Sequence, residues 1–182
     1  MRVGIIGTGW GLMHVGAFRA AGAEVTALCG RDLQKTRQLA ARESIPLGTT
    51  DVAELCRVVD AVVVASSDAM HHAHVLAALR AGRHVLCEKP LAFTLAEALE
   101  LVTASAAAPS LRAVVGFPYR QLTPLVGLRA WLEGRSAVRA LDVVLRSSFV
   151  SRGDDGSGSA DFGGASHPID AALWLARARP EW

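Results

Sequence analysis

One apolar run, DAVVVA at residues 60–65, limits the possible folds more than any other stretch of the chain. The run is rich in β-branched residues and has no polar alternation, which is typical of a strand buried on both faces of a sheet. Helices are expected on either side of it, one opening at residues 51–54 and one at residues 69–81. Helices that cover both faces of a strand predict a parallel sheet built from crossover connections.

The same succession of strand and helix continues along the first part of the chain. Further strands are expected at residues 3–6, 24–28, around Ile45, 84–88 and 112–117, and further helices at residues 12–21, 32–41, from 94 onward and 122–133. Repeated βα units predict an α/β fold with a doubly wound parallel sheet. The alternation then loosens into a long strand at 138–150, a glycine- and serine-rich loop at 152–164 and a last helix at 168–177. We therefore expect one domain at residues 1–120 and the start of a second at residues 121–182.

Two helix ends carry specific signals. Gly82 follows the helix at 69–81 and suits the left-handed conformation that often ends a helix. Thr94 and Glu97 have the spacing of a capping box. The helix that follows Thr94 is expected to form one apolar face from Leu95, Leu99 and Val102.

Composition excludes several classes of partner. The net charge of +2 and the pI near 8.6 are too mild for nucleic-acid binding, and no run of 18 apolar residues is present to cross a membrane. Cys29, Cys56 and Cys87 lack CxxC spacing and are expected to be reduced, partly buried thiols. The apolar N-terminus has features of a secretory leader, but five glycines and His14 interrupt it. We therefore expect a cytoplasmic protein.

The segment GIIGTGWG at residues 4–11 joins the first strand to the first helix. Gly7 permits a tight turn, Gly9 lacks a side chain that would keep a phosphate away, and the first N–H groups of the helix attract an anion. The strict G-x-G-x-x-G pattern has its third glycine where this chain has Leu12, and Gly11 stands one position earlier. The segment predicts a cradle for a dinucleotide pyrophosphate; the alternative is a glycine turn without a ligand.

The end of the second predicted strand bears on which dinucleotide binds. NAD-preferring sites have a carboxylate there for the ribose 2′-hydroxyl, whereas NADP-preferring sites lack it and provide an arginine. This chain has Gly30 followed by Arg31, which favours NADP(H) over NAD(H). Two alternatives stay open: Arg31 is only a solvated residue before a helix cap at Asp32, or Asp32 itself reaches a ribose.

A second candidate for chemistry is CEKPLA at residues 87–92. It follows a strand end, and this is the edge where ligands bind in open α/β sheets. Lys89, among apolar neighbours and near a cofactor, would serve as a proton donor or acceptor, and Pro90 would fix the turn that aims it. The alternative is a surface lysine in a turn.

Three segments, GIIGTGWG, DAVVVASSDAMHHAHVLAALRAGRHVLCEKPLA and VGFPYR, together resemble the Gfo/Idh/MocA family of NAD(P)-dependent oxidoreductases. The resemblance implies an N-terminal Rossmann domain and a C-terminal α/β domain with a large open sheet. It also implies sugars, polyols or related alcohols and carbonyl compounds as small-molecule substrates. Glu88–Pro90 match the family's EKP, whose lysine acts in proton transfer and substrate binding. Ser66 and Ser67 match the loop that lines the cofactor, and His71 matches the histidine that closes it.

HPID at residues 167–170 is similar to the family's G-x-H-x-x-D, which brings a second catalytic side chain to the nicotinamide. With Pro168 at the first helical position, His167 would be the N-cap, and Asp170 would complement the helix dipole. The helix N-terminus would also keep His167 uncharged and able to accept a proton. The alternative is that both residues only cap a helix.

Three positions depart from the family pattern. Gly163 replaces an aspartate four residues before the histidine, with Asp161 two residues further back; Ala165 replaces a glycine, and Pro118 an asparagine. These departures predict altered acid–base chemistry or an altered substrate.

Taken together, these inferences assign every candidate site residue. Cofactor binding is expected from Gly7, Thr8, Gly9, Trp10, Gly11, Gly30, Arg31, Ser66, Ser67, His71 and Glu88; catalysis from Lys89 and His167; and substrate binding from Lys89, Tyr119, Arg120 and Asp170. The histidines of HHAH at residues 71–74 lack a carboxylate or cysteine partner at fixed spacing, so no metal site is expected. His72 and His74 are expected on a helix surface.

Members of the family that the chain resembles are nearly twice as long. We therefore expect a truncated product of a longer gene; alternatively, the strand at 138–150 pairs with another chain in a homo-oligomer. The leading hypothesis is hydride transfer between nicotinamide and a sugar-like alcohol or carbonyl compound. The alternatives are a catalytically inactive nucleotide-binding protein and a reductase of imines or enones in a biosynthetic pathway.

Overall fold

The computed structural model describes residues 1–133 and 160–177. The chain divides into two compact units, Met1–Gly116 and Phe117–Trp182, whereas the sequence predicted a boundary near residue 120. The strand predicted at 138–150 and residues 152–159 of the predicted loop lie outside the described residues.

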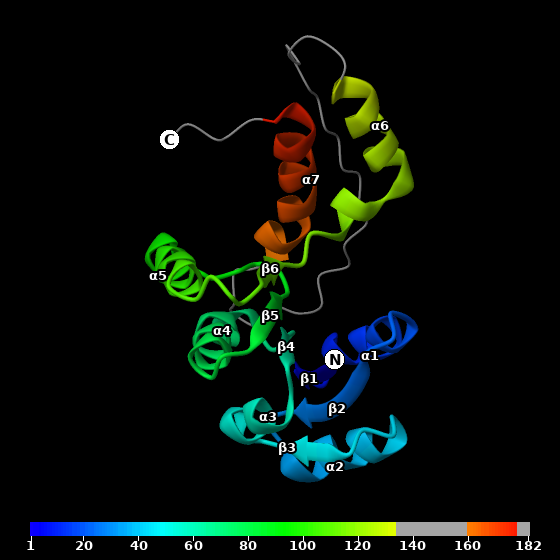
Figure 1. The fold of residues 1–182 in the computed structure, drawn as a ribbon, viewed down its shortest axis with the longest axis vertical. Helices are drawn as coiled ribbons and strands as arrows, with labels where there is room; N and C mark the ends of the chain where they lie inside the picture. Colours follow the sequence, from blue (N-terminus) through cyan, green and yellow to red (C-terminus); the bar gives the residue numbers. More distant parts are fainter. Residues whose placement is uncertain (134–159, 178–182) are drawn as a thin grey trace. The chain divides into compact units, whose positions relative to one another are not determined.

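A six-stranded parallel sheet forms the centre of the first unit (Figure 1). Its strands are β1 Arg2–Ile6, β2 Glu24–Cys29, β3 Leu47–Thr49, β4 Ala61–Val64, β5 His84–Cys87 and β6 Ala113–Val115. The spatial order is β3-β2-β1-β4-β5-β6, and all neighbouring strands run parallel. The order reverses between β1 and β4, as in the doubly wound Rossmann sheet, so the predicted fold class is confirmed.

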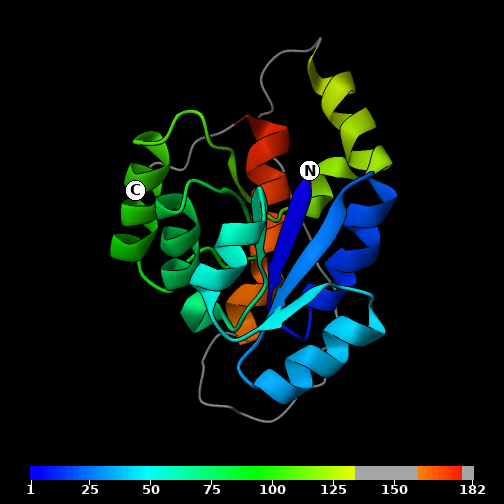
Figure 2. The ribbon, with the colours of Figure 1, turned by 60° about the horizontal axis from the view of Figure 1, so that its bottom comes forward.

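Helices cover both faces of this sheet (Figure 2). One face carries α1 Gly11–Ala20 and α2 Leu33–Arg42; the other carries α3 Val52–Val58, α4 His71–Arg80 and α5 Leu95–Ala106. Two hydrophobic clusters fill the space between the sheet and these two layers. The predicted arrangement of helices on both faces follows from the β-branched strands, which form the middle layer and present apolar side chains to both sides.

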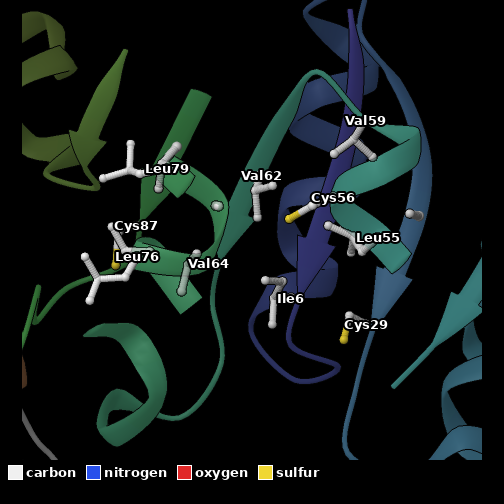
Figure 3. Close-up of a cluster of buried hydrophobic side chains, with 14 of the residues drawn as sticks. Ile6, Cys29, Leu55, Cys56, Val59, Val62, Val64, Leu76, Leu79 and Cys87 are labelled. Carbon is white, nitrogen blue, oxygen red and sulfur yellow. The ribbon is translucent and has the colours of Figure 1, made fainter. Parts of the chain in front are cut away.

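Alternate residues of each strand supply the two clusters. In β1, Val3 and Ile5 face α1 and α2, whereas Ile6 packs with α3 and α4 on the opposite face. In β4, Val62 and Val64 point into the cluster on the α3–α4 face, which Figure 3 shows with side chains of these two helices. Every residue of β4 is buried, as the run DAVVVA predicts. All three cysteines are free and buried.

The predicted end signals of two helices are confirmed. Thr94 and Glu97 form the capping box at the start of α5: the Thr94 hydroxyl accepts from the Glu97 N–H, and the Glu97 carboxylate accepts from the Thr94 N–H. Gly82 follows α4 with φ of +71°, and its N–H donates to the Leu79 carbonyl at 2.9 Å. The strand expected around Ile45 instead begins at Leu47, and Ile45 is buried in the loop before it.

The apolar face predicted for α5 does not pack against the core. Leu95, Leu99 and Val102 are exposed, with Leu95 at 75%. The helix is instead held through Leu101, which is 3% exposed and packs in the α3–α4 cluster. Spacing at i, i+4 and i+7 marks one side of a helix but does not determine which side meets the sheet.

The second unit contains a 3₁₀ turn at Pro118–Gln121 and the helices α6 Thr123–Glu133 and α7 Ala160–Ala176. The prediction that the last helix begins at Pro168 with His167 as its N-cap is wrong, because α7 begins at Ala160 and Pro168 lies inside it. Proline is favoured at the first helical position and costs a backbone hydrogen bond in the interior, but α7 accommodates Pro168 inside it, so the proline alone does not fix the start. His167 is an interior helical residue, and the inferences from a helix N-terminus at His167 and Asp170 no longer apply.

In the described part of the chain, no helix combines the length and apolar character needed to cross a bilayer.

Candidate functional site

The carboxyl ends of four parallel strands carry most of the predicted site residues. The turn Gly7–Gly11 follows β1, Gly30 and Arg31 follow β2, Ser66 and Ser67 follow β4, and Glu88 and Lys89 follow β5. Because neighbouring strands are parallel, these segments meet at one edge of the sheet. His71 opens α4, just after the β4 segment.

Gly7 forms a turn that only glycine can form at this position. Its φ is +127°, and its N–H donates to the Cys29 carbonyl at 2.9 Å. A Cβ at Gly7 would lie 2.0 Å from the carbonyl oxygen of Ala65, which directly follows β4. The turn after β1 is therefore pressed against the end of β4, at the point where the strand order reverses.

The next two glycines differ in their surroundings. A Cβ at Gly9 would meet no protein atom within 4 Å, so protein packing does not require a glycine there. A Cβ at Gly11 would lie 2.9 Å from Ile5 Cγ2, so Gly11 allows α1 to approach β1 closely. Close packing of helix on strand is the task of the third glycine in the strict pattern, and here it falls to Gly11 rather than to residue 12. No side chain caps the N-terminus of α1.

Position 30, at the end of β2, has no room for a side chain. A Cβ there would lie 2.3 Å from Thr36 Oγ1 and 2.6 Å from Thr8 Cγ2. Arg31 is exposed, and the Asp32 carboxylate accepts the Lys35 N–H at 2.8 Å as the N-cap of α2. The end of β2 thus presents the Arg31 guanidinium and no carboxylate at residue 30, while the Asp32 carboxylate caps a helix.

His71 links two loops at the sheet edge. The ring is fully buried; its Nδ1 lies 2.7 Å from the Pro90 carbonyl oxygen and its Nε2 lies 3.2 Å from the Ser66 carbonyl oxygen. Ser66 is also tied to His74, because its hydroxyl lies 2.9 Å from His74 Nδ1. Burial and the neighbouring His71 lower the pKa of His74. His74 therefore contacts the loop after β4 and is partly buried, whereas the sequence predicts it on a helix surface. Ser67 is exposed and precedes the 3₁₀ turn Asp68–Met70.

Glu88 joins the turn after β5 to the glycine turn. Its Oε1 accepts from Trp10 Nε1 at 3.2 Å and lies 2.9 Å from His14 Nε2, while Oε2 accepts the Lys89 N–H at 3.3 Å. Burial alone would raise the pKa of Glu88, but the hydrogen bonds from His14 and Trp10 lower it below its usual value. Sequence reasoning gave His14 no role. The signal for it was the spacing of Trp10 and His14, four residues apart and hence on one side of the same helical turn.

Lys89 is half-buried in this turn and is joined to Pro90 by a cis peptide bond. The residues on both sides of Lys89 are held by side chains from other elements, Glu88 by α1 and Pro90 by His71.

Within residues 1–133 and 160–177, no cluster of three or more histidine, cysteine or carboxylate side chains has a geometry suited to a metal ion. His72 points to α5, where its Nε2 lies 2.9 Å from Glu100 Oε2.

In the second unit, the remaining predicted residues contact one another. The Tyr119 ring stacks on the His167 ring with 4.8 Å between centroids and 18° between planes, and Phe117 meets His167 edge-on at 6.1 Å. Arg120 Nε donates to Asp170 Oδ2 at 2.8 Å, and a second bond from the same guanidinium reaches Oδ1. The hydrogen bond with Asp170 raises the pKa of Arg120. Asp170 is 8% exposed, and the two hydrogen bonds from Arg120 fix its carboxylate in this buried position.

Comparison with known proteins agrees with this geometry. The model of an oxidoreductase family with an NAD-binding Rossmann fold matches residues 1–117. An inositol 2-dehydrogenase of Paenarthrobacter aurescens is 39% identical over 186 residues, covering 96% of this chain and 55% of the relative. A 1,5-anhydro-D-fructose reductase of Ensifer adhaerens is 43% identical over 93 residues, covering 50% of this chain and 28% of the relative.

A solved structure gives the same result. The myo-inositol dehydrogenase of Lactobacillus casei, in complex with NAD(H) and myo-inositol, matches with a TM-score of 0.81 and 26% identity over 97% of this chain and 54% of that one. The chain thus spans about half or less of the length of the relatives it matches. The family model covers well over half of the chain, and its matched residues include the glycine turn and the EKP turn described above. The chain belongs to the Gfo/Idh/MocA family of oxidoreductases with an NAD-binding Rossmann fold.

Proposed function

We propose that this chain carries the dinucleotide site and part of the substrate site of an NAD(P)-dependent oxidoreductase. Its substrate would be a sugar, a polyol or a related small alcohol or carbonyl compound, the chemical class named for the relatives. The observation that carries the proposal is the turn after β1. Gly7 is pressed against Ala65 at the switch point of the sheet, and a Cβ at Gly9 would meet no protein atom within 4 Å.

The residues of this turn fit a dinucleotide. A Cβ at Gly9 would project where protein packing makes no demand, so a glycine there leaves the backbone accessible to a pyrophosphate. The N-terminus of α1 has no side-chain cap, which leaves its N–H dipoles suited to an anion. Thr8, Trp10 and Ser66 flank the same edge and would contact the sugar and nicotinamide parts.

Lys89 would handle the substrate proton. It lies in the turn after β5 that Glu88 ties to Trp10, and hence on the same sheet edge as the glycine turn. Bound nicotinamide supplies or accepts the hydride. The Lys89 amine would exchange the proton of the reacting hydroxyl, with His167 as a second proton-exchanging group. Tyr119, Arg120 and Asp170 of the second unit would bind the substrate, and the Arg120–Asp170 pair fixes both of those side chains.

The direct test is titration of the chain with NADPH and NADH, followed by cofactor fluorescence. We expect saturable binding of at least one of them, and turnover of a compound in a panel of myo-inositol, scyllo-inositol and 1,5-anhydro-D-fructose. Saturable binding without turnover of any sugar, polyol, imine or enone would favour a nucleotide-binding protein without catalysis. The absence of saturable binding of both nucleotides would defeat the proposal.

We further propose that NADP(H) is preferred over NAD(H). Position 30 has no room for the carboxylate that would bind a ribose 2′-hydroxyl and repel a 2′-phosphate. The Asp32 carboxylate is already used as the N-cap of α2. Arg31 is exposed beside it and would be able to pair with a 2′-phosphate.

Replacing Arg31 with alanine tests this preference. We expect the Kd for NADPH to rise by about 10-fold or more, because a charge-assisted hydrogen bond to phosphate is lost. The Kd for NADH should stay within about 2-fold, because NADH lacks the 2′-phosphate that Arg31 would bind. Arg42→Ala, at the other end of α2, is the matched control, since Arg42 is exposed and its ion pair in the described part of the chain is with its neighbour Glu43. Equal loss of NADPH and NADH affinity in Arg31→Ala would contradict the preference.

Three free and buried thiols suit a reducing compartment, and we propose the cytoplasm on that ground.

A further inference from the structure

The Glu88 carboxylate connects two segments that are far apart in the sequence. Trp10 lies 78 residues and His14 74 residues before it, and both side chains meet the same oxygen, Oε1. The other oxygen accepts the N–H of Lys89. Three donors from the start of α1 and from the turn after β5 thus converge on one side chain.

This carboxylate is poorly exposed and charged. The Glu88 side chain is 14% exposed and that of His14 19%. The hydrogen bonds from His14 and Trp10 outweigh the effect of burial and hold the pKa of Glu88 below its usual value. Because the carboxylate is ionised at neutral pH, the His14 nitrogen that faces it carries the hydrogen. Removing that donor would leave a mostly buried charge with one fewer partner, which favours a new position for the side chain.

Lys89 stands between two fixed points. Before it, Glu88 is held to α1 by His14 and Trp10; after it, the Pro90 carbonyl lies 2.7 Å from buried His71 Nδ1. The His71 contact secures the turn to α4, whereas the Glu88 contact secures it to the glycine turn. The position of the Lys89 backbone relative to the glycine turn therefore depends chiefly on the Glu88 contacts.

We propose that His14 is a positioning residue that, through Glu88, holds Lys89 in register with the cofactor turn. The role rests on the proposed function, because it gives Lys89 a substrate to meet. His14 itself touches neither substrate nor the reacting atoms. It acts on the geometry of the turn after β5, and Trp10 shares the task from the other side of the carboxylate.

The test compares His14→Leu with His14→Gln in the full chain. Leucine removes the donor at similar size, whereas the glutamine amide restores an N–H that can reach the carboxylate. With the best substrate of the inositol and anhydrofructose panel, we expect kcat of His14→Leu to fall by about 10-fold to 100-fold, the effect of misplacing a catalytic group by about 1 Å. KM should change by less than about 3-fold, because the expected change lies in placing the catalytic amine. His14→Gln should recover most of the lost kcat.

A matched control separates positioning from the general effect of breaking a histidine–glutamate pair. His72 faces Glu100 at the same 2.9 Å, but this pair links α4 to α5 away from the glycine turn. His72→Leu should leave kcat at the wild-type value. A fall in kcat for His72→Leu as large as that for His14→Leu would overturn the proposal.

The indole N–H signal of Trp10 in an NMR spectrum gives a readout that needs no turnover. The chain has four tryptophans, and the signal missing in Trp10→Phe identifies Trp10. We expect this signal to move in His14→Leu and in Glu88→Gln, and to lie near its wild-type position in His14→Gln and His72→Leu. A Trp10 signal unmoved in both His14→Leu and Glu88→Gln would overturn the proposal. Failure of the wild-type chain to bind either dinucleotide would instead defeat the proposed function, while the Trp10 signal would still report whether His14 fixes Glu88.

Discussion

Replacing Lys89 with methionine is expected to lower kcat by about 10²-fold to 10⁴-fold, the usual contribution of a positioned acid–base group. Methionine keeps the apolar stem of the half-buried side chain and removes only the amine. The Kd for NADPH should change by less than about 3-fold, because the glycine turn that would bind the pyrophosphate belongs to another segment and keeps its own packing. Steady-state kinetics and a fluorescence titration measure the two quantities.

Lys89→Arg separates proton exchange from simple attraction of charge. Arginine keeps the positive charge but holds its proton throughout the accessible pH range. If Lys89 exchanges the substrate proton, the arginine variant should be nearly as inactive as the methionine variant. Lys35, the chain's other lysine, is exposed on α2, and Lys35→Met should retain wild-type kcat. An arginine variant with wild-type kcat would contradict a role in proton transfer and leave Lys89 as a charge for binding only.

Features set by a few neighbouring residues could be predicted from the sequence. Two helix ends depend only on local backbone geometry: the capping box of Thr94 and Glu97, and the left-handed Gly82. Their residue types and spacing therefore predict them. The parallel sheet followed from the same logic, because a strand such as β4 without polar positions must be covered on both sides. Once a parallel sheet is predicted, the position of the candidate site follows, because the carboxyl ends of parallel strands lie at one edge.

Features that depend on a distant partner could not be predicted. His14 matters through Glu88, 74 residues later; its spacing from Trp10 indicates a shared side of the helix but not the partner that both contact. The sequence predicts His74 on a helix surface, because it does not show that the bend after β4 brings the Ser66 hydroxyl to this ring. The start of α7 was misplaced for a related reason: proline suits the first turn of a helix, and the helix continues before it.

Gly7 is required by protein packing and Gly9 is not, so alanine at the two positions should have different effects on stability. Gly7→Ala should lower the free energy of unfolding by roughly 2–5 kcal/mol, because its φ of +127° strains an L-residue and its Cβ would lie 2.0 Å from the Ala65 carbonyl oxygen. Gly9→Ala should leave that free energy within about 1 kcal/mol of wild type, since its Cβ meets no protein atom within 4 Å. Urea unfolding followed by circular dichroism measures both.

Gly9→Ala should fold almost as stably as the wild type but should bind NADPH more weakly. In Gly9→Ala, the added methyl group would stand between the backbone and a pyrophosphate, so the Kd for NADPH should rise by about 10-fold to 100-fold through lost hydrogen bonds to a charged group. Gly16→Ala is the matched control. Gly16 lies inside α1, which follows the turn of Gly9, and its Cβ would also meet nothing within 4 Å. Alanine there should stabilise the helix by up to about 1 kcal/mol without changing the Kd. A Gly9→Ala variant that folds and binds NADPH as tightly as Gly16→Ala would contradict the proposal that this turn binds the pyrophosphate. A fold as stable in Gly7→Ala as in the wild type would show that the turn is not pressed against β4.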